Sequence, residues 1–586
     1  MADSLFDVVI LGGGIAGLCV ARHLLRLSPP SGARPTLCAS GALRIGLVDP
    51  GPLPADATRS KVGESSTEAS SWYLGERLGL AAHLEACQVK KLGLRFFLPG
   101  PRDGAFADRP EFGVMTPGPR TFAVPFAGLD PVTWQLHRGR LEASLFADLA
   151  DPAAGVTFRP ATRSVVRLGQ PHRVDLDGPA GIETWRARWV IDASGRGLAV
   201  PSSPDEDRAL GHHAQAAWFW APHRIDPDAF SSDPTFASRI PKDLRWRSTN
   251  HLVGQGYWVW IIALADGTTS IGVVSDPAQH PPEQFTHEGG CRAWIARHEP
   301  ELSAALRGHD APWAGYARRV WESHARRTLV SSERWAVTGD TAAFLDPLFS
   351  SGLDFITIGN ELLVPQVLAD LAGHDIGREA RRASSLFARM VEQYLHLYQG
   401  SYVVMGHPRA MMAKIVWDLA TYLGFLAPIV RSGRLADEAF MARVGFVGQG
   451  VATLQARVSA VLVGWATAKA RSATSPDATP GRSSSPCVDH ACTPLAALVL
   501  RLREARHGDV LELVQANLGL LEQLAVAVFR RACEDIGLDA PDGPLNPYGV
   551  GLDPSAWAAD GLTGGARPVG VEPWVARAME RVWLPS

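Results

Sequence analysis

Near its N-terminus the chain alternates between strand-like and helix-like patterns. Residues 6–11 form a short apolar run rich in β-branched side chains, residues 12–17 form a glycine-rich turn, and residues 18–27 have apolar positions at helical spacing. A second apolar run at residues 43–48 ends in Asp49. This order of strand, tight turn, helix and strand predicts a βαβ unit.

Two further apolar runs end in turns of small residues. One is Trp-Val-Ile-Asp-Ala-Ser-Gly at residues 189–195, and the other is Trp-Ala-Val-Thr-Gly-Asp at residues 335–340. We expect three strand ends to meet at one site. Residues 175–189 and 257–274 show the turn-punctuated pattern of an antiparallel sheet, which we expect to cover that site.

The pattern becomes helical after residue 360. Apolar residues recur at three- and four-residue spacing in residues 362–371, 386–397 and 411–430. Residues 495–536 are again amphipathic.

The predicted fold class is therefore α/β, with a Rossmann-like βαβ core, an antiparallel sheet and a mostly α-helical C-terminal region. We expect the core with its interleaved sheet at residues 1–360 and a helical region at residues 361–469. Residues 470–494 are rich in Ser, Thr, Pro, Gly and Ala and predict a flexible linker. A C-terminal helical extension and tail would occupy residues 495–586.

Composition excludes several function classes. The 57 Lys and Arg against 60 Asp and Glu give a formal net charge of -3, so no positive field favours nucleic acid as a partner. With 46% hydrophobic residues the chain can bury a large core. No uninterrupted apolar run reaches about 18 residues, and residues 1–7 lack a signal-peptide pattern. We expect a soluble cytoplasmic protein with no membrane partner.

The seven cysteines are too few for a disulfide framework and fit a reducing cytoplasm. Cys487, His490 and Cys492 bring three soft ligands together without a nearby fourth, and a solvated linker is the simpler interpretation. We therefore expect no metal site.

The glycine-rich turn has the composition of a phosphate-binding site. In residues 12–17 the missing side chains would let the backbone approach a pyrophosphate, whose charge would meet the helix N-terminus. Asp49 is suited to the ribose hydroxyls of an adenosine, although it lies further along than the usual ~20 residues. A loop insertion at residues 28–40 explains that spacing. A purely structural βα turn is the alternative.

These motifs, in this order, resemble the flavin-binding core of the p-hydroxybenzoate hydroxylase superfamily. The resemblance implies an FAD-binding βαβ core, with the antiparallel sheet covering the flavin. Arg138 resembles the superfamily's flavin-contacting arginine, and a surface salt bridge is its alternative role. The residues that we expect to bind FAD are Gly12, Gly14, Ile15, Ala16, Gly17, Asp49, Glu64, Ser65, Arg138, Gly339, Asp340 and Pro347.

Three stretches look like the flavin-dependent halogenases of that superfamily. They are Gly-Glu-Ser-Ser at residues 63–66, Trp-Val-Trp-Ile-Ile-Ala at residues 258–263, and Phe-Leu-Asp-Pro-Leu-Phe-Ser-Ser-Gly at residues 344–352. The resemblance covers about residues 5–430 and is closest to halogenases of pyrrole, phenol or polyketide substrates. The helical tail looks more loosely like the pyrrolnitrin-type enzymes. The resemblance implies that reduced FAD and oxygen convert a halide into hypohalous acid.

A halide site is then required. By the resemblance, Ser351 and Gly352 supply consecutive backbone N–H groups that hold chloride or bromide, as an anion-binding turn does. The alternative is that this turn only binds the flavin ring.

The tryptophan motif implies a bulky wall that keeps the organic substrate away from the reacting flavin. Trp258 and Trp260, two residues apart on a strand, would point to the same face. Ordinary core packing of two aromatics is the alternative. The sequence departs from the family at Ala263, where the family has proline, and this departure favours direct hydroxylation.

A lysine between flavin and substrate guides the hypohalous acid in the family. Lys91 resembles that lysine because a glycine and a phenylalanine follow it in the same pattern. An ammonium group with three donors and a tunable pKa suits the task. Lys90 is the alternative residue, and a lysine pair on the surface is the alternative role.

The substrate is indicated only in outline. Free-tryptophan halogenases carry a glutamate where this chain has Phe349, which disfavours an amino-acid substrate and suggests an apolar pocket. We predict an FAD-dependent halogenase that uses reduced flavin, O₂ and halide to chlorinate or brominate an electron-rich aromatic natural product, either free or tethered to a carrier protein.

Reduced FAD would come from a separate flavin reductase, because we find no second nucleotide turn: the glycines at residues 561–565 lack a preceding strand. The first alternative is a flavin-dependent aromatic monooxygenase. The second is a flavin-binding scaffold without its own chemistry, which presents a tethered substrate or partner.

Overall fold

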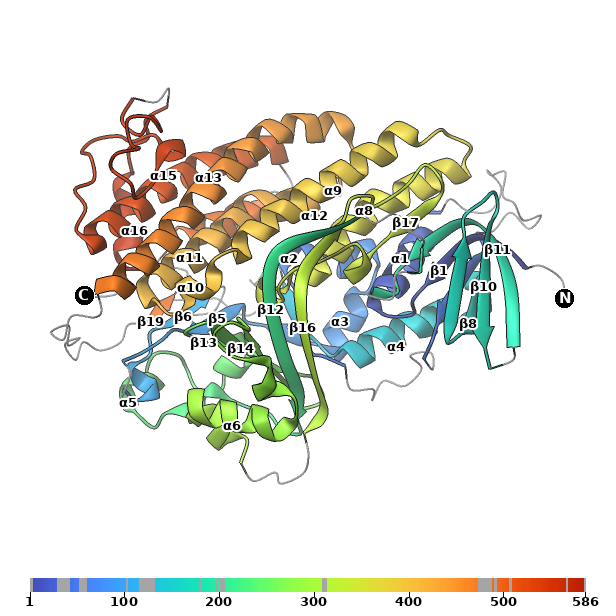
Figure 1. Ribbon diagram of the computed structural model, residues 1–586, viewed down its shortest axis with the longest axis horizontal. Coiled ribbons are helices and arrows are strands. Elements are labelled where there is room, and N and C mark those ends of the chain that lie inside the picture. Colours follow the sequence, from blue (N-terminus) through green and yellow to red (C-terminus); the bar gives the residue numbers. More distant parts are fainter. Residues whose placement is uncertain are drawn as a thin grey trace. The chain divides into compact units, whose positions relative to one another are not determined.

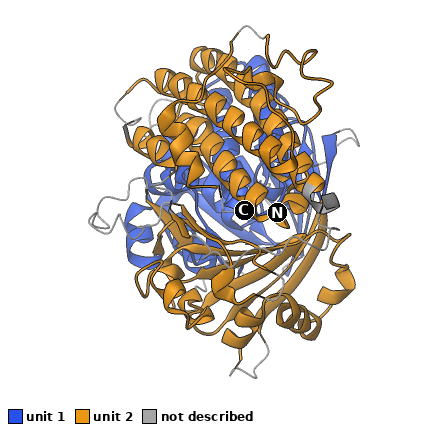
Figure 2. Ribbon diagram, turned by 90° about the vertical axis from the view of Figure 1, so that its left-hand side faces the viewer, with its two compact units in different colours: residues 1–88, 136–212, 322–395 blue, residues 89–135, 213–321, 396–586 orange. Residues whose placement is uncertain are grey.

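The chain folds into two units, each assembled from three stretches of sequence (Figure 2). Unit 1 contains Met1–Gln88, Leu136–His212 and Glu322–Leu395, and unit 2 contains Val89–Gln135, His213–Trp321 and His396–Ser586. The computed structural model describes residues 4–28, 43–51, 61–101, 104–114, 132–179, 181–195, 199–200, 206–307, 313–472, 487–489, 493–504, 508–564 and 567–583.

Unit 1 is built on a mixed sheet (Figure 1). Strands β1, β2, β8, β11 and β17 pair in parallel, and β9, β10 and β11 pair in antiparallel fashion. The parallel strands β1 and β2 are buried along almost their whole length, as apolar runs in parallel sheets are. The strands, in sheet order, are β8 (Val156–Pro160), β2 (Ile45–Asp49), β1 (Ser4–Leu11), β11 (Gly181–Asp192), β10 (His172–Gly178) and β9 (Arg163–Arg167), with β17 (Trp335–Val337) also on β11.

The predicted order of strand, turn, helix and strand is confirmed by β1, α1 and β2. Residues 175–189 are antiparallel as predicted, but they extend the sheet of β1 instead of joining the second sheet, because β11 continues into the parallel ladder. Helix α1 packs against α4 and α8. The helices of unit 1 are α1 (Ile15–Leu27), α2 (Glu68–Trp72), α3 (Ala81–Cys87), α4 (Arg138–Leu149), α8 (Ser351–Leu371) and most of α9 (Gly377–Tyr398).

Unit 2 contains a second, mainly antiparallel sheet. The strand pairs β12–β15, β15–β14, β14–β13 and β5–β6 are antiparallel, whereas β5 with β13 and β6 with β19 are parallel. One face carries an apolar core that includes Phe97, Leu252, Val259 and Ile261. The strands, in sheet order, are β18 (Ala343–Phe344), β16 (Ala314–Arg326), β12 (Asp207–Ala221), β15 (Thr269–Ser275), β14 (Tyr257–Ala263), β13 (Thr249–Gly254), β5 (Leu94–Phe97), β6 (Glu111–Val114) and β19 (Cys487–Asp489).

The C-terminal part of unit 2 is helical, as predicted. Helix α13 packs against α11 and α15. Within the predicted linker, Cys487–Asp489 form strand β19, whereas most of the remaining linker, the loop at residues 29–42 and both His490 and Cys492 lie outside the described residues. The helices are α10 (Ser401–Met405), α11 (Pro408–Thr421), α12 (Ala427–Arg431), α13 (Glu438–Ser472), α14 (Leu495–Glu504), α15 (Val510–Ile536) and α16 (Pro573–Glu580).

Three helical stretches are, by length and composition alone, long and apolar enough to cross a membrane: Pro408–Arg431, Glu438–Ala468 and Val510–Ile536. Polar residues interrupt the runs, which is why no continuous apolar stretch is visible in the sequence. In the first stretch Lys414 and Asp418 form a buried ion pair at 2.8 Å. The expectation of a soluble cytoplasmic protein without a membrane partner stays a prediction.

Candidate active site

The carboxyl ends of three strands of unit 1 lie side by side. Leu11 at the end of β1 pairs with Asp192 of β11, and Asp192 pairs with Val337 of β17. Gly12 follows β1 with a φ of +114°, and a Cβ there would lie 2.3 Å from the carbonyl oxygen of Ala193. The expectation that three strand ends meet at one site is confirmed.

The turn after β1 brings an open helix end to this place. Gly14 is the N-cap of α1, and no side chain caps the helix. A Cβ at Gly17 would lie 1.8 Å from the carbonyl oxygen of Gly12, and a Cβ at Gly339 would lie 2.6 Å from the Cβ of Ala16. Only glycine fits at both positions. The free amides at the start of α1 therefore lie against closely packed backbone, which is the geometry of a pyrophosphate site.

Asp49, at the end of β2, stabilises the glycine turn. Its Oδ2 accepts the N–H of Gly13 at 2.6 Å, and its Oδ1 accepts the N–H of Gly51 at 2.8 Å. Each carboxylate oxygen keeps a second lone pair. Binding of ribose hydroxyls by Asp49 is compatible with these contacts and stays a prediction.

Arg138 opens helix α4 between two carboxylates. Its guanidinium pairs with Glu64 of β3 (Glu64–Ser65) and donates to Oε1 of Glu142 at 2.6 Å, while Lys61 also pairs with Glu142. Burial raises the pKa of Glu64, and the charge of Asp340 acts in the same direction. Arg138 is therefore fixed by two ion pairs.

The turn that leads into α8 is strained. Phe349 and Ser350 both have a φ of 63°, the left-handed region that non-glycine residues rarely adopt. Asp346 stabilises the turn, because its Oδ1 accepts the N–H of Leu348 at 3.0 Å and its Oδ2 lies 3.1 Å from Nε2 of His212. Two consecutive residues of this kind reverse the chain directly before the helix begins.

Helix α8 begins at Ser351. The Ser351 hydroxyl donates to the carbonyl of Asp346 at 3.0 Å, and the N–H of Ser350 donates to the carbonyl of Pro347 at 3.0 Å. Gly352 is exposed, and a Cβ there would meet no atom of the described residues within 4 Å. The first amides of this long helix have no intrahelical acceptor and carry the positive end of its dipole. The amides of Ser351 and Gly352 are therefore suited to a small anion.

Both candidate lysines lie on strand β4 (Val89–Lys91) of unit 2, on opposite sides of it. Lys91 is buried, with 7% of its surface exposed, and pairs with Thr133 of β7 (Thr133–Leu136). The ammonium of Lys90 lies 5.9 Å from the ring centroid of Trp134. Successive residues of a strand point to opposite sides, so the two lysines cannot share one role.

Trp258 and Trp260 lie on the same face of the second sheet, opposite the apolar core. Their ring centroids are 5.8 Å apart, and Nε1 of Trp260 donates to Oγ of Ser270 at 3.2 Å. Trp260 lies across Gly272 of β15, where a Cβ would come within 2.1 Å of the indole. The indole N–H of Trp258 is buried and has no hydrogen-bond acceptor within the described part of the chain.

His251 is a residue of this face that sequence reasoning missed. It lies directly opposite Trp260 in the pairing of β13 and β14, and its ring centroid is 5.8 Å from that of Trp258. Burial lowers the pKa of its imidazole, and the charge of Lys91 acts in the same direction. Only the register between β13 and β14 could have indicated it.

The predicted residues thus fall into two sets, one in each unit. The cofactor and halide residues belong to unit 1, where α8 packs against the turn at Gly339–Thr341. Lys91, Trp258 and Trp260 belong to unit 2, where the two tryptophans lie together and the place of Lys91 beside them stays a prediction.

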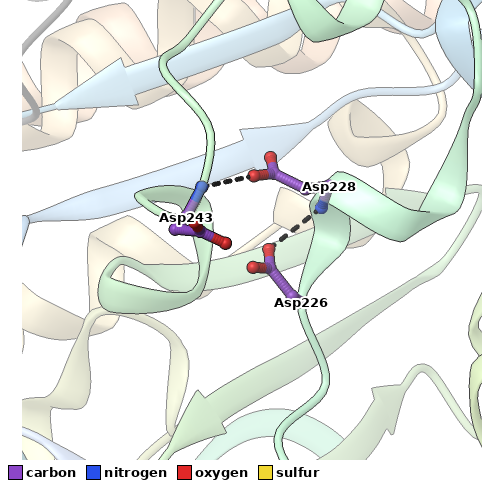
Figure 3. A group of neighbouring side chains, drawn as sticks. All are labelled: Asp226, Asp228 and Asp243. Carbon is purple, nitrogen blue, oxygen red and sulfur yellow. Dashed lines mark hydrogen bonds between the residues drawn. The ribbon is translucent and has the colours of Figure 1, made fainter.

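Three aspartates of unit 2 form a cluster outside the predicted site (Figure 3). The N–H of Asp228 donates to Oδ1 of Asp226 at 3.0 Å, and the N–H of Asp243 donates to Oδ2 of Asp228 at 2.8 Å. Arg245 donates to Oδ1 of Asp228 at 2.6 Å. Burial and the neighbouring carboxylates raise the pKa of Asp226 to about 6. Two backbone N–H groups and one guanidinium thus hold the three carboxylates together, and the cluster is a network that stabilises the loop.

Comparison with known proteins gives the family context. No family model matches the chain. A flavin-dependent halogenase, chlA, of Dictyostelium discoideum is 26% identical over 453 residues, which cover 72% of this chain and 70% of that protein. The 1H-pyrrole-2-carbonyl-(peptidyl-carrier protein) chlorinase of Pseudomonas fluorescens is 24% identical over 396 residues, covering 65% of this chain and 79% of that protein. The chain is a relative of the flavin-dependent halogenases.

Solved structures agree with this relationship at the level of the fold. The halogenase PltM in complex with phloroglucinol and FAD superposes with a TM-score of 0.58 at 17% identity, covering 87% of this chain and 96% of that one. The flavin-dependent brominase Bmp2 superposes with a TM-score of 0.52 at 17% identity, covering 80% of this chain and all of that one. The resemblance and the α/β fold class predicted from the sequence are confirmed.

Proposed function

We propose that this halogenase relative is itself an FAD-dependent halogenase, which uses reduced flavin, O₂ and chloride or bromide to halogenate an electron-rich aromatic compound. The observation that carries the proposal is the turn before α8. Two left-handed residues, Phe349 and Ser350, lead directly into the first amides of α8 at Ser351 and Gly352, and a Cβ at Gly352 would meet no described residue within 4 Å. Such a turn suits a halide, because it offers positive potential without a side chain that hypohalous acid would attack.

The residues of unit 1 fit FAD. The close backbone approaches at Gly12, Gly17 and Gly339 and the uncapped start of α1 form a cradle for a pyrophosphate. Asp49 would hold the adenosine ribose, and Arg138 with Glu64 would lie beside the flavin. When bound in its reduced form, FAD would supply the two electrons that activate O₂, and O₂ would provide the oxidising equivalents that convert halide into hypohalous acid.

The residues of unit 2 would then control the oxidant and the substrate. Trp258 and Trp260 form a rigid aromatic surface that holds the organic substrate back. The ammonium of Lys91 donates hydrogen bonds to hypohalous acid and directs it toward the ring. Because Lys91 is buried, it would meet the oxidant in a place that contains little water.

The substrate is proposed to be an electron-rich aromatic ring, because only such a ring is attacked readily by hypohalous acid. Phe349 provides an apolar side chain where an orienting carboxylate would be needed for a free amino acid. The name of the Pseudomonas relative specifies a pyrrole carried on a peptidyl carrier protein, so a tethered substrate is included in the proposal. A separate reductase would supply reduced FAD.

The first experiment combines purified protein, FAD, a flavin reductase, NADH, O₂ and either bromide or chloride with a panel of phenols, indoles and pyrroles. We expect products with the isotope pattern of the added halide, measured by mass spectrometry. Hydroxylated product formed without halide would contradict the proposal and indicate a flavin-dependent monooxygenase instead. Ala263 is the feature that favours this second candidate, since it continues the pairing of β14 with Thr269 where a proline would end it. Failure to bind FAD would point to a role other than flavin chemistry.

The second experiment compares two adjacent lysines. Lys91→Met should reduce halogenation by about 100-fold or more, the range seen when a positioned donor is removed. Lys90→Met is the matched control, because Lys90 lies over Trp134 on the other side of β4, and its activity should stay within about threefold of the wild type. Full activity in Lys91→Met would contradict the relay.

A further inference from the structure

His212 of strand β12 contacts the strained turn before α8. Its Nε2 lies 3.1 Å from Oδ2 of Asp346, and both side chains are buried. An ionised carboxylate only accepts hydrogen bonds, so Nε2 carries the hydrogen and donates it. The two residues are far apart in the sequence, and both belong to unit 1. His212 therefore holds the turn from a strand outside it.

Asp346 connects His212 to the start of α8. Its Oδ1 accepts the N–H of Leu348 at 3.0 Å, and its carbonyl oxygen accepts the hydroxyl of Ser351 at 3.0 Å. Asp346 thus lies one hydrogen bond from the residue that begins the helix, yet its two carboxylate oxygens bind Leu348 and His212. Of these three partners, His212 alone lies outside the turn.

The first turn of α8 is held separately, by Asp354. This residue is fully buried, and its Oδ1 accepts the hydroxyl of Thr67 at 2.5 Å while its Oδ2 accepts the hydroxyl of Tyr394 at 2.6 Å. The helix therefore keeps its place when the contacts of the turn change. The turn itself contains two left-handed residues, a strained backbone that persists only when neighbouring contacts hold it. A change at His212 should therefore act on the turn and not on the helix.

Asp346 carries the kind of group that binds an uncapped helix start. Ser350 is the N-cap of α8, and its side chain makes no capping hydrogen bond. A carboxylate is a good acceptor for the free amides of such a start, because it complements their partial positive charge. Released from His212, the carboxylate of Asp346 would turn toward these amides. There it would compete with a halide for the N–H groups of Ser351 and Gly352.

We propose that His212 is a positioning residue of the halide site, because it holds the carboxylate of Asp346 in the turn. The amides of Ser351 and Gly352 thereby stay open to chloride or bromide. This role rests on the halide site proposed above. A buried histidine suits the task, since it supplies a donor for the carboxylate and no negative charge that would repel the halide.

The first test measures the amides of the turn directly and needs no halide, reductant or substrate. Purified full-length protein is exchanged in deuterated, halide-free buffer, and mass spectrometry with electron-transfer fragmentation follows the amides one by one. In His212→Leu the amide of Leu348 should exchange about tenfold faster, because it loses the carboxylate of Asp346. The amides of Ser351 and Gly352 should exchange about tenfold slower, because they gain it. Faster exchange at all three amides, or no change at any of them, would overturn the proposal.

Two amide variants and a second histidine provide the matched controls. His212→Gln places a side-chain N–H near the position of Nε2 and should keep the wild-type exchange pattern. His212→Asn is too short to reach Asp346, so it should show the pattern of His212→Leu, and this comparison holds even when His212→Leu does not fold. His172→Leu removes another buried histidine of unit 1, whose Nε2 lies 3.0 Å from the carbonyl oxygen of Arg334. If His172→Leu changes the turn in the same way, loss of any core histidine suffices and the proposal is wrong.

The second test uses the halogenation assay. In His212→Asn the KM for bromide should rise about tenfold or more, because Asp346 competes for the same amides, while kcat and the KM for the aromatic substrate stay within about threefold of wild type. His212→Gln should restore the KM for bromide. Adding Asp346→Asn to His212→Asn removes the competing charge and should lower the KM for bromide again.

The positioning role and the proposed function fail in different ways. If wild-type protein does not halogenate, the proposed function fails, and the exchange pattern still decides whether His212 restrains Asp346. If wild type halogenates and His212→Asn matches it in the KM for bromide or in amide exchange, the positioning role is wrong.

Discussion

Gly272 shows how one missing side chain shapes the aromatic surface. Trp260 lies across Gly272, and a Cβ there would come within 2.1 Å of the indole. The ring cannot move far, because its Nε1 is bonded to Ser270. We expect Gly272→Ala to lower the free energy of unfolding by about 1–3 kcal/mol, the usual cost of overpacking, and to change the near-ultraviolet circular dichroism of the tryptophans.

Gly519→Ala is the control for this substitution. Gly519 lies inside helix α15, and a Cβ there would have no neighbour within 4 Å in the part of the chain that the structure describes. Alanine in a helix interior is favoured over glycine by about 0.5–1 kcal/mol, so this variant should gain stability. If both alanine variants unfold at the same denaturant concentration as wild type, Trp260 is not confined by Gly272.

At this scale the sequence identified residue types but not their surroundings. It indicated that a lysine takes part in the reaction but did not decide between Lys90 and Lys91. The pairing of β4 with β7 distinguishes them, because Lys91 is buried and Lys90 lies over Trp134. His251 carried no signal of its own among 18 histidines. Its place depends on the register of two strands, which a hydrophobic pattern does not specify.

Among the elements, the turn before α8 has a backbone that its residues do not favour. Ser350 has φ 63° and ψ 34°, where a side chain costs of order 1 kcal/mol. We expect Ser350→Gly to raise the free energy of unfolding by about 0.5–1 kcal/mol, because glycine adopts this conformation without strain. The same change should loosen the amides of Ser351 and Gly352 and raise the KM for bromide.

Ser350→Ala separates strain from the loss of the hydroxyl. Alanine keeps the Cβ and hence the strain, so it should give no gain in stability. Equal stabilisation by alanine and glycine, measured by denaturant unfolding, would show that the left-handed backbone is not the cause.

The aspartate cluster allows a prediction with a defined pH dependence. The pKa of Asp226 is raised to about 6 from its ordinary value of 3.8. Below pH 6 the folded state binds a proton that the unfolded state does not bind until about pH 4, so this group makes the protein more stable as the pH falls through that window. Asp226→Asn keeps an oxygen for the N–H of Asp228 and removes the charge, so it should be more stable than wild type at pH 8, with the gain vanishing near pH 4.

Asp233→Asn provides the opposite case. Asp233 is exposed at the N-cap of α5 (Pro234–Ala237), and its hydrogen bonds with Thr235 lower its pKa. Its contribution is present above its ordinary pKa and is lost in acid, so its replacement should bring no gain at pH 8. A gain in both variants would mean that general charge reduction, and not the cluster, stabilises the protein.

The elements themselves were largely predictable because their patterns are local. The apolar run of β1, the glycines of the following turn and the start of α1 all specify the same βαβ geometry. The hairpin of β10 and β11 was recognised as antiparallel, but its membership of the first sheet was not, since alternation reveals which face is buried and not which strand is adjacent. The left-handed backbone of Phe349 and Ser350 could not be predicted, because neither residue type favours that conformation.

For the whole molecule, the fold class followed from the order of strand and helix patterns, and the relationship to halogenases rested on a few motifs. The division into units did not follow, because each unit combines three separate stretches of chain. In unit 1 the strands β1, β11 and β17 are far apart in sequence. Leu11, Asp192 and Val337 lie side by side only because these strands pair in the sheet.

Both units contain a buried neutral histidine, which predicts how the whole molecule responds to acid. Burial lowers the pKa of His23 in unit 1 and of His251 in unit 2 to about 3 each, from an ordinary 6.5. The unfolded chain therefore takes up a proton at each histidine below about pH 6.5, whereas the folded chain takes up that proton only below about pH 3. The stability that both provide at neutral pH should be lost as the pH falls, by about 1.4 kcal/mol per pH unit for each histidine.

Denaturant unfolding at pH 8, 6, 5 and 4 measures this slope. His23→Gln and His251→Gln should each flatten it by one proton, and if the units unfold in separate transitions, each variant should flatten only the transition of its own unit. An unchanged slope in both variants would show that other groups govern the acid response.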